Sequence, residues 1–421
     1  MIKRLFLVGL LVNLLACTSQ EEKAQKQAAL LQQDLSLLNY IPGDTIQRLD
    51  GSAVSSAELD VEFQELIERA RVAGLAVSIF NATEPVYVKT FGYANKEEGE
   101  PLQVNSILGA ASLSKAVFAY LVSILVEEGT IDLDVPLQSY FDKPLYEYSF
   151  GKKWQNFQDL KGDERLGKIT GRMCLTHTTG FQNWRWIPRP GDDNPEEKLK
   201  IIFEPGTQYY YSGEGIQLLQ YTVEHITGKG LEELAQEKIF KPLHMENTSY
   251  VWQERFEDRL AFGHDSDENV LSRDEREQAR SAGSMQTNLI DYSLFARHLL
   301  KEYAAGSPIV RRLFEPNFRI KTKRQFGPQS VEMTDENDDI ALSYGLGWGN
   351  LQTPYGVAGF KEGHDEGFQH YTILFPEAGK GMLILTNSDN GESIYKELLE
   401  SGIDDVYTPW EWEGYIPYNT Q

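Results

Sequence analysis

Residues 370–386, HYTILFPEAGKGMLILT, contain two β-rich runs, 370–375 and 381–386, on either side of the turn-forming stretch PEAGK. Runs rich in β-branched and aromatic residues around a Pro/Gly turn are typical of a β-hairpin. A second pair of such runs lies near the other end of the chain, where LAVSIF (75–80) is joined to VYVKTFGYA (86–94) by a five-residue link. The sequence therefore predicts a hairpin close to each end of the chain.

Helical patterns surround these hairpins. Residues 55–74 carry apolar side chains at helical spacing between serine caps and Gly74, and residues 391–407 resemble a closing helix. The stretch from about 115 to 335 favours helices and long loops. We predict an α+β fold: a mainly antiparallel sheet built from both chain ends and flanked by helices, with an inserted, mostly helical subdomain. The domain is expected to span 55–402, with a C-terminal tail over 403–421.

The N-terminus, MIKRLFLVGLLVNLLAC, has two basic residues, a short apolar run and a small residue before Cys17. This pattern is typical of a signal peptide, predicted over 1–16, and the apolar run is too short for a permanent membrane span. Leu-Leu-Ala-Cys resembles a bacterial lipobox, which implies cleavage and acylation at Cys17; a plain secretory signal with a chance cysteine is the alternative. Residues 17–54 are then a lipid-anchored tether or a loosely attached segment, on the periplasmic or extracellular side of a bacterial envelope.

Charge and composition exclude several classes of function. The net charge of −23 repels phosphate, so nucleic acid is not an expected partner. The seven histidines are scattered and match no common metal motif, and no glycine-rich phosphate loop is present, so we predict no metal and no cofactor. Cys174 has apolar neighbours and is expected to be a buried apolar residue. The oligomeric state stays open.

The candidate chemistry lies in ILGAASLSKAVFAYLVSILVEEG (107–129), where Ser112 and Lys115 are three residues apart. If a helix begins near Ser112, both side chains lie on one face, close to the free N–H groups of the first turn. The run that follows is almost entirely apolar, which indicates a buried helix. Burial lowers the pKa of a lysine, and a neutral lysine can accept a proton from a serine hydroxyl. We therefore predict that Ser112 is a nucleophile activated by Lys115.

Two other serines have a lysine at the same spacing, Ser149 and Ser393. The first is followed by glycine and adjacent lysines, and the second lies in a charged amphipathic segment. A solvated lysine keeps its proton. Only the sequence after Ser112 predicts a fully buried helix.

At this point the chain resembles the serine β-lactamase and penicillin-binding-protein-like hydrolases, in the branch with class C β-lactamases, D-Ala-D-Ala carboxypeptidases, D-aminopeptidases and related esterases. Several stretches carry the resemblance by their order and spacing, among them AASLSK (110–115), LTHTTGF (175–181), FEPGTQYYYSGEG (203–215), YGLGWG (344–349) and GHDEGFQHYTILF (363–375). The resemblance implies a β-lactamase/transpeptidase-like fold and an acyl-enzyme reaction.

The family's second motif, Tyr-x-Asn, falls on Tyr211-Ser212-Gly213. The resemblance implies that Tyr211 moves protons at the site, although it also belongs to a run of three tyrosines that would suit a core. Gly213 has no amide to hold a substrate carbonyl or Lys115, and Glu214 is a possible replacement. The departure at Gly213 puts β-lactam and D-Ala-D-Ala recognition in doubt.

The family's third motif, Lys-Thr-Gly or His-x-Gly, is matched to His364-Asp365-Glu366, an alignment open to slipping by a residue or more. The resemblance implies that His364 binds substrate and that the N–H of Gly367 holds the oxyanion together with that of Ser112. His177 is assigned to a structural turn. Trp184 and Trp186 are expected either to form an aromatic rim or to pack at a domain junction.

The sequence thus predicts a serine hydrolase that acts through Ser112, Lys115 and Tyr211 on an ester or amide. Its partner would be a small-molecule or peptide acyl substrate, with the membrane reached through the lipid anchor. The departures from the second and third motifs favour an esterase or D-amino-acid peptidase over a true β-lactamase. The alternative is a slow acylating or non-hydrolytic penicillin-binding sensor of the envelope.

Overall fold

The computed structural model describes residues 32, 35–38, 40–152, 155–187, 190–191, 194, 196–272 and 275–420. The predicted signal peptide and Cys17 lie outside these residues. The strands are β1 (Thr45–Gln47), β2 (Ala53–Ser55), β3 (Gly74–Asn81), β4 (Glu84–Asn95), β5 (Glu100–Pro101), β6 (Leu108–Gly109), β7 (Gln286–Thr287), β8 (Phe318–Arg319), β9 (Ser343–Tyr344), β10 (Gly349–Thr353), β11 (Gly356–Asp365), β12 (Phe368–Phe375) and β13 (Lys380–Thr386). The α-helices are α2 (Ser56–Arg69), α3 (Leu113–Glu127), α4 (Gly171–Leu175), α5 (Gly213–Thr227), α6 (Leu231–Ala235), α7 (Leu289–Ala305), α8 (Pro308–Phe314), α9 (Tyr395–Ile403) and α10 (Trp410–Glu413).

A nine-stranded antiparallel sheet forms the centre of the molecule, in the order β5-β4-β3-β13-β12-β11-β10-β9-β8. The two predicted hairpins, β3–β4 and β12–β13, are both present and become neighbours through the pairing of β3 with β13. The prediction of one antiparallel sheet built from both chain ends is therefore confirmed. Strands β9 to β11 were not predicted.

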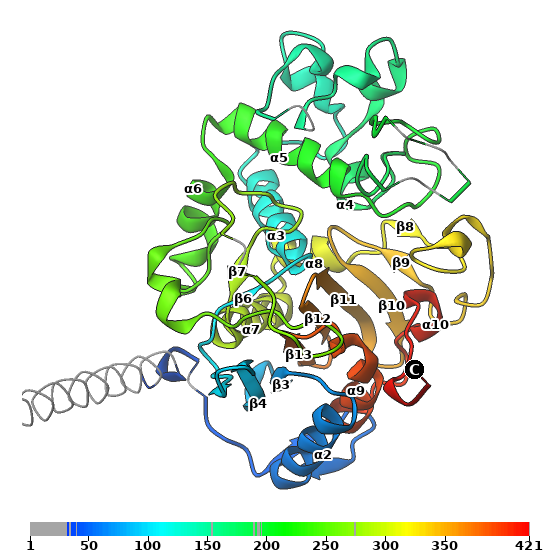
Figure 1. Cartoon of the computed structure of the whole chain (residues 1–421). Helices are drawn as coiled ribbons and strands as arrows, with labels where there is room; N and C mark the ends of the chain where they lie inside the picture. The colour runs from blue at the N-terminus through cyan, green and yellow to red at the C-terminus, as the bar shows by residue number, and fades with distance from the viewer. Residues whose placement is uncertain are drawn as a thin grey trace, which may run out of the picture.

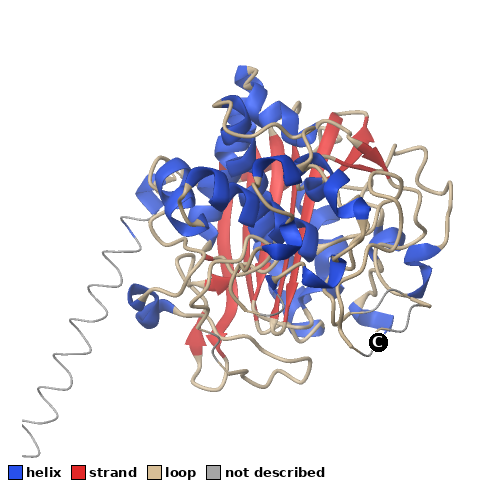
Figure 2. Ribbon diagram, turned by 90° about the horizontal axis from the view of Figure 1, so that it is seen from above, coloured by secondary structure: helices blue, strands red, loops and turns tan. Residues whose placement is uncertain are grey.

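Helices cover both faces of the sheet (Figures 1 and 2). α2 and α9 pack on one face, and α3, α7 and α8 pack on the other. β13 shows why both faces are apolar: Leu383 and Leu385 join the core under α3 and α7, whereas Met382 and Ile384 join the core under α2 and α9. Because side chains alternate along a strand, a central strand covered on both sides needs a continuous apolar run.

The predicted helix over 55–74 is α2, which begins at a capping box between Ser55 and Glu58. The predicted insertion corresponds to the region from α3 to α8, whose outer part, with α4 and α5, lies above the sheet in Figure 1. This region forms the wall opposite the edge of β11.

Both predicted terminal segments join the fold where the structure describes them. Within the predicted tether, β1 pairs with β2, and Ile46 is fully buried. The predicted tail over 403–421 instead contains α10, where Trp412 is buried and donates its indole N–H to the Thr322 hydroxyl at 3.1 Å. The tail prediction missed this packing because two tryptophans in a short acidic stretch have no periodic pattern.

Candidate active site

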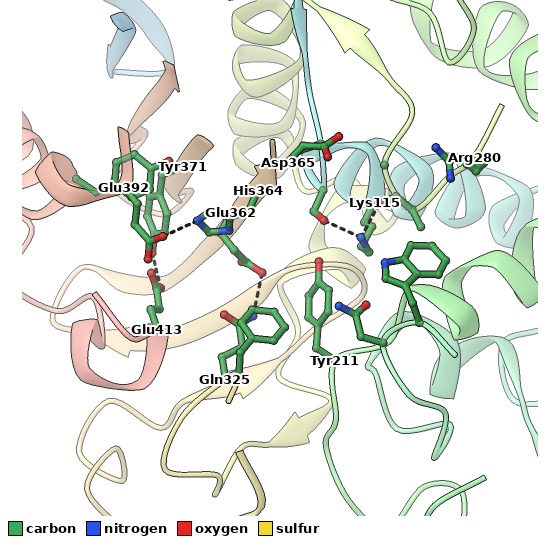
Figure 3. Close-up of a pocket in the computed structure, with 18 of the residues that line it drawn as sticks. Lys115, Tyr211, Arg280, Gln325, Glu362, His364, Asp365, Tyr371, Glu392 and Glu413 are labelled. Carbon is green, nitrogen blue, oxygen red and sulfur yellow. Dashed lines mark hydrogen bonds and ion pairs between the residues drawn. The ribbon is translucent and has the colours of Figure 1, made fainter. Parts of the chain in front are cut away.

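A cavity of about 440 Å³ lies between the sheet and the helical region, and Ser112, Lys115 and Tyr211 line it. Ser112 and Lys115 come from the start of α3, and Tyr211 comes from the loop before α5. The opposite wall comes from β11 and from the C-terminal part of the chain. Figure 3 shows Tyr211 and Lys115 on one side of this space, with the side chains of β11 facing them.

Ser112 and Lys115 are in direct contact. The Lys115 Nζ lies 2.8 Å from the Ser112 Oγ and also donates to the carbonyl of Ala282. Ser112 stands immediately before the first helical residue, and nearly every side chain that follows in α3 is buried. The helix therefore forms as predicted, and it holds the two side chains on one face.

Lys115 has only 2% of its surface exposed. Burial, followed by the positive charge of Lys361, lowers the pKa of Lys115 well below its ordinary value. The charges of Glu362 and Asp365 act in the opposite direction but do not outweigh burial. The structure thus gives Lys115 the property that the sequence predicted for it: its ammonium form is disfavoured.

Tyr211 lies between two buried lysines. Its phenol oxygen accepts a hydrogen bond from the Lys361 Nζ at 3.1 Å, while the Lys115 Nζ sits 5.1 Å from the centre of its ring. Burial and the charge of Glu362 raise the pKa of Tyr211 well above its ordinary value, and a hydrogen bond with Ser112 partly opposes this. Tyr211 therefore belongs to the Ser112 site and is more than one member of a tyrosine-rich core.

Lys361 is a site residue that the sequence analysis missed. It lies on β11, is fully buried, and forms an ion pair with Glu362 at 2.9 Å. The next residue but one, Gly363, passes close to the start of α3, because a Cβ at this position would lie 3.0 Å from the Ala110 carbonyl oxygen. Lys361-Glu362-Gly363 thus runs beside the start of the serine helix, immediately before His364-Asp365-Glu366, the triplet to which the sequence analysis matched the third motif.

His364 still lines the cavity, one residue after Gly363. Its Nε2 contacts the Glu392 carboxylate at 3.0 Å. Burial opposes the charged imidazolium, but the hydrogen bond and charge of Glu392 outweigh burial and raise the pKa of His364. The side chain is therefore engaged with Glu392 rather than with Tyr211 or Lys115.

Gly367 does not occupy its predicted place. Its N–H donates to the Asp389 carboxylate at 2.7 Å, and a Cβ on Gly367 would lie 2.6 Å from the Cα of Gly263. The residue forms the turn between β11 and β12 with φ of 72° and is not among the residues that line the cavity. Its predicted role in holding an oxyanion is thus without support, because its N–H is already paired.

The structure gives a steric reason for the glycine at position 213, where the family's second motif has an asparagine. A Cβ on Gly213 would lie 2.5 Å from the indole of Trp184, so no larger side chain fits beside that ring. Trp184 stacks on Trp186 at 5.3 Å between ring centres, and both line the cavity, as the first of the two alternatives for these residues expects. Asn183, the residue before Trp184, accepts a hydrogen bond from the Gly213 N–H through its side-chain oxygen at 3.0 Å. Asn183 also lines the cavity. A carboxamide is therefore present near the position of the absent motif asparagine.

Glu214 does not replace that asparagine. Both of its carboxylate oxygens accept hydrogen bonds from Arg185, at 2.9 and 3.0 Å, and both side chains are buried. His177 is also structural, as predicted: its Nδ1 accepts the Ser212 N–H at 3.1 Å, and its ring lies 4.2 Å from that of Tyr211. Burial and the charges of Lys361 and Lys115 lower the pKa of His177 well below its usual value, so it supports Tyr211 as a neutral ring.

The cavity also contains residues that carried no signal in the sequence, among them Glu392 and Glu413 at the end far from Ser112. Within the described ranges, no group of three or more His, Cys, Asp or Glu side chains is arranged to hold a metal ion. None of the described helices has the length and apolarity needed to cross a bilayer.

The chain is similar to relatives of two kinds, an esterase and a penicillin-binding protein. The chain is 28% identical to the lovastatin esterase of Penicillium rubens over 260 residues, which cover 57% of this chain and 63% of the esterase. It is 24% identical to penicillin-binding protein 4* of Bacillus subtilis over 373 residues, which cover 82% of this chain and 74% of the relative. The esterase match thus spans less than two thirds of that relative's own length.

Solved structures show the same fold. The octameric penicillin-binding protein homologue of Pyrococcus abyssi superposes with a TM-score of 0.65 at 20% identity, covering 85% of this chain and 80% of the other. The D-alanine carboxypeptidase AmpC of Burkholderia cenocepacia gives 0.63 at 19% identity, covering 82% and 98%. The Beta-lactamase family model matches residues 59–401, and the chain therefore belongs to this family.

Proposed function

We propose that this protein is a serine hydrolase that cleaves an ester or amide through an acyl-enzyme on Ser112. The observation that carries the proposal is the buried Lys115 Nζ at 2.8 Å from the Ser112 Oγ. A lysine held in its neutral form at that distance is a general base for the hydroxyl.

In the first step, Lys115 takes the hydroxyl proton while the Ser112 Oγ bonds to the substrate carbonyl carbon. The bond to the leaving group then breaks, and the proton passes to that group through the Tyr211 phenol. The Lys361 ammonium at 3.1 Å from this phenol favours negative charge on its oxygen as the proton moves. Water reverses the sequence: it bonds to the acyl carbon, releases the acid and returns the proton to Ser112.

When Ser112 attacks, negative charge develops on the oxygen of the substrate carbonyl. Backbone N–H groups that point at this oxygen would stabilise it. β10 pairs with β11 only as far as Phe360, so residues 361–365 present an edge beyond the end of β10. The Glu362 carbonyl points to this edge, because it accepts a hydrogen bond from Lys361 Nζ. Backbone groups alternate in direction along an antiparallel strand, so the N–H of His364 faces the same edge. We therefore assign the oxyanion to the N–H groups of Ser112 and His364.

The substrate class favoured is a small ester or an amide of a D-amino acid. Relatives named as an esterase and as a D-alanyl-D-alanine carboxypeptidase support this range. Trp184 closes the space beside Gly213 and narrows the cavity where the family's asparagine would stand. This change favours an ester or a small acyl group over a β-lactam.

The test uses a chain that begins at residue 18, treated with a fluorophosphonate and read by intact mass, alongside hydrolysis of p-nitrophenyl esters. We expect one adduct and turnover in the wild type, and neither in Ser112→Ala. Ser149→Ala is the matched control, because Ser149 also precedes a lysine by three residues but is exposed. Labelling that survives Ser112→Ala contradicts the proposal, and a lasting adduct without turnover favours the slow-acylating sensor.

We also propose that the chain is exported and anchored by lipid on Cys17, on the strength of the Leu-Leu-Ala-Cys pattern. In a bacterial host, the wild type should fractionate with membranes and incorporate labelled palmitate. Cys17→Ser should lose the label and appear in the soluble envelope fraction. Cys174→Ser is the control, since that thiol is buried. Palmitate incorporation that persists in Cys17→Ser would contradict the anchor.

A further inference from the structure

The end of the cavity far from Ser112 is both acidic and aromatic. Glu362, Glu392 and Glu413 line it together with three rings, those of Tyr371, Tyr395 and Trp410. Figure 3 shows Glu392, Tyr371 and Glu413 gathered on the side away from Lys115. Trp410 and Glu413 lie beyond residue 401, where the family match ends. This compartment is therefore formed in part by a segment outside the family match.

The negative charge of this compartment is incompletely balanced. Glu362 pairs with Lys361 at 2.9 Å and Glu392 with His364 at 3.0 Å. Glu413 accepts a hydrogen bond from the Tyr371 hydroxyl at 2.8 Å, but no Lys, Arg or His of the described chain forms an ion pair with it. Burial and the charges of Glu362 and Glu392 raise the pKa of Glu413 well above its ordinary value. A cation placed beside Glu413 would relieve this crowding.

Two polar atoms of the compartment are buried without a partner. The Tyr395 hydroxyl belongs to a side chain with 1% exposure, and the Glu362 Oε2 belongs to one with 4% exposure. Neither atom has a hydrogen-bond partner among the described residues. Buried polar atoms in native proteins are nearly always paired, and leaving one unpaired is costly. Two unpaired oxygens on one cavity wall indicate a ligand that donates hydrogen bonds.

The rings fit the same ligand. Tyr371 lies 5.6 Å from Tyr395 and 5.9 Å from Trp410, both in tilted arrangements. The face of an aromatic ring attracts a cation, most strongly in a desolvated site. We propose that this compartment binds a protonated amine carried by the substrate, with Glu413 and Glu392 as counter-ions and the Tyr395 hydroxyl as a hydrogen-bond acceptor.

This inference rests on the proposed function, because it places the amine in the cavity where Ser112 reacts. It narrows the substrate to an ester or amide with an ammonium group at the end remote from the reacting carbonyl. A carboxylate in the same place would be repelled by Glu392 and Glu413. The charge of the compartment thus separates amino-functional substrates from those with a terminal carboxylate.

The first test measures binding and needs no catalysis. Titration calorimetry on the chain from residue 18 would compare benzylamine, benzyl alcohol and benzoate. We expect benzylamine to bind about tenfold or more tightly than the alcohol, from hydrogen bonds to charged acceptors, and benzoate to bind more weakly still. Equal affinities for the amine and the alcohol would overturn the inference.

Variants assign the effect to named groups. Glu413→Gln keeps an acceptor for Tyr371 but removes the charge, and should lower benzylamine affinity about tenfold. Tyr395→Phe keeps the ring and should lower it about threefold or more, because it removes one acceptor. Glu411→Gln is the matched control, since Glu411 is on the same helix but exposed. If both Glu413→Gln and Tyr395→Phe keep the wild-type melting temperature and the wild-type affinity for benzylamine, the inference is wrong.

A substrate pair links this site to the reaction. The p-nitrophenyl esters of 4-(aminomethyl)benzoate and 4-ethylbenzoate differ mainly in charge. We expect the wild type to have a higher kcat/KM for the aminomethyl ester than for the ethyl ester. Glu413→Gln should remove this difference by raising the KM of the aminomethyl ester. Ser112→Ala should still bind benzylamine. If Ser112 is not labelled while amine binding persists, the proposed function fails alone; if Ser112 is labelled without an amine preference, only the inference fails.

Discussion

At the level of single residues, the unusual feature of this site is that two buried lysines approach one tyrosine. The Lys361 Nζ contacts the Tyr211 phenol, and the Lys115 Nζ contacts Ser112 and lies over the Tyr211 ring. Glu362 neutralises one of the two lysines at 2.9 Å. Burial lowers the pKa of both lysines. The charge and hydrogen bond of Glu362 oppose this effect for Lys361, whereas the pKa of Lys115 falls well below its ordinary value. We therefore assign the task of accepting the serine proton to Lys115.

The role of Lys361 can be separated from its effect on stability. Lys361→Met should reduce kcat about 100-fold, within the range for a proton-transfer group, and destabilise the fold by about 3–5 kcal/mol because Glu362 is left buried and unpaired. The double variant Lys361→Met/Glu362→Gln should recover most of the stability in urea unfolding but not the kcat. Recovery of activity in the double variant would show that Lys361 serves only the ion pair.

The depressed pKa of Lys115 sets the direction of two pH effects. Activity requires the neutral amine, so kcat/KM should fall as pH falls through the pKa of Lys115. The unfolded chain holds this proton up to the ordinary lysine pKa, whereas the folded chain releases it at lower pH. Wild-type stability relative to Lys115→Met should therefore rise with pH by about 1.4 kcal/mol per unit between these two pKa values. A pH-independent difference in urea unfolding would contradict the depressed pKa.

At the level of elements, local pattern predicted some parts of the molecule well. α3 was predictable because its apolar run immediately follows Ser112, and the outer hairpins were predictable because each contains its own turn. β11 was not: GVAGFKEGHD mixes glycines with charges, and its Lys361 is buried by segments about 150 residues away in sequence. Gly363, which lies close to Ala110 and Leu113, is the residue of this strand whose small size matters for its position beside α3.

The short helix α10 is the element whose importance the sequence least suggests. The Trp412 backbone accepts the Gln325 N–H at 2.8 Å, and its indole is fully enclosed. Gln325 in turn donates to Glu362 at 2.9 Å, so α10 is connected to the catalytic wall through one side chain. The C-terminal segment therefore supports the position of Glu362 as well as lining the cavity.

Truncating the side chain of Trp412 tests this connection. Trp412→Ala should cost about 3–5 kcal/mol in the free energy of unfolding, as expected for a buried tryptophan. It should also lower activity, because Gln325 and Glu413 lose their support. Ile416→Ala, a few residues further on and 58% exposed, should change stability by less than about 0.5 kcal/mol. Equal unfolding midpoints for the two variants would contradict a structural role for α10.

At the level of the whole molecule, the fold and the start of the serine helix were easier to predict than the full lining of the cavity. Ser112, Lys115 and Tyr211 came from short motifs, and the structure brings all three together. No local sequence pattern predicted the acidic compartment. Its three glutamates, Glu362, Glu392 and Glu413, belong to separate segments that meet only when the sheet closes. The amine preference that we propose therefore depends on segments brought together by long-range assembly, which a single sequence shows poorly.

The pairing of β3 with β13 has a consequence for biosynthesis. Phe80 lies opposite Gly381, so a strand made early must wait for one made almost last. A premature stop before residue 380 would leave the nascent β3 with an open, apolar edge, which invites intermolecular pairing. The central sheet therefore cannot close until nearly the whole polypeptide has left the ribosome.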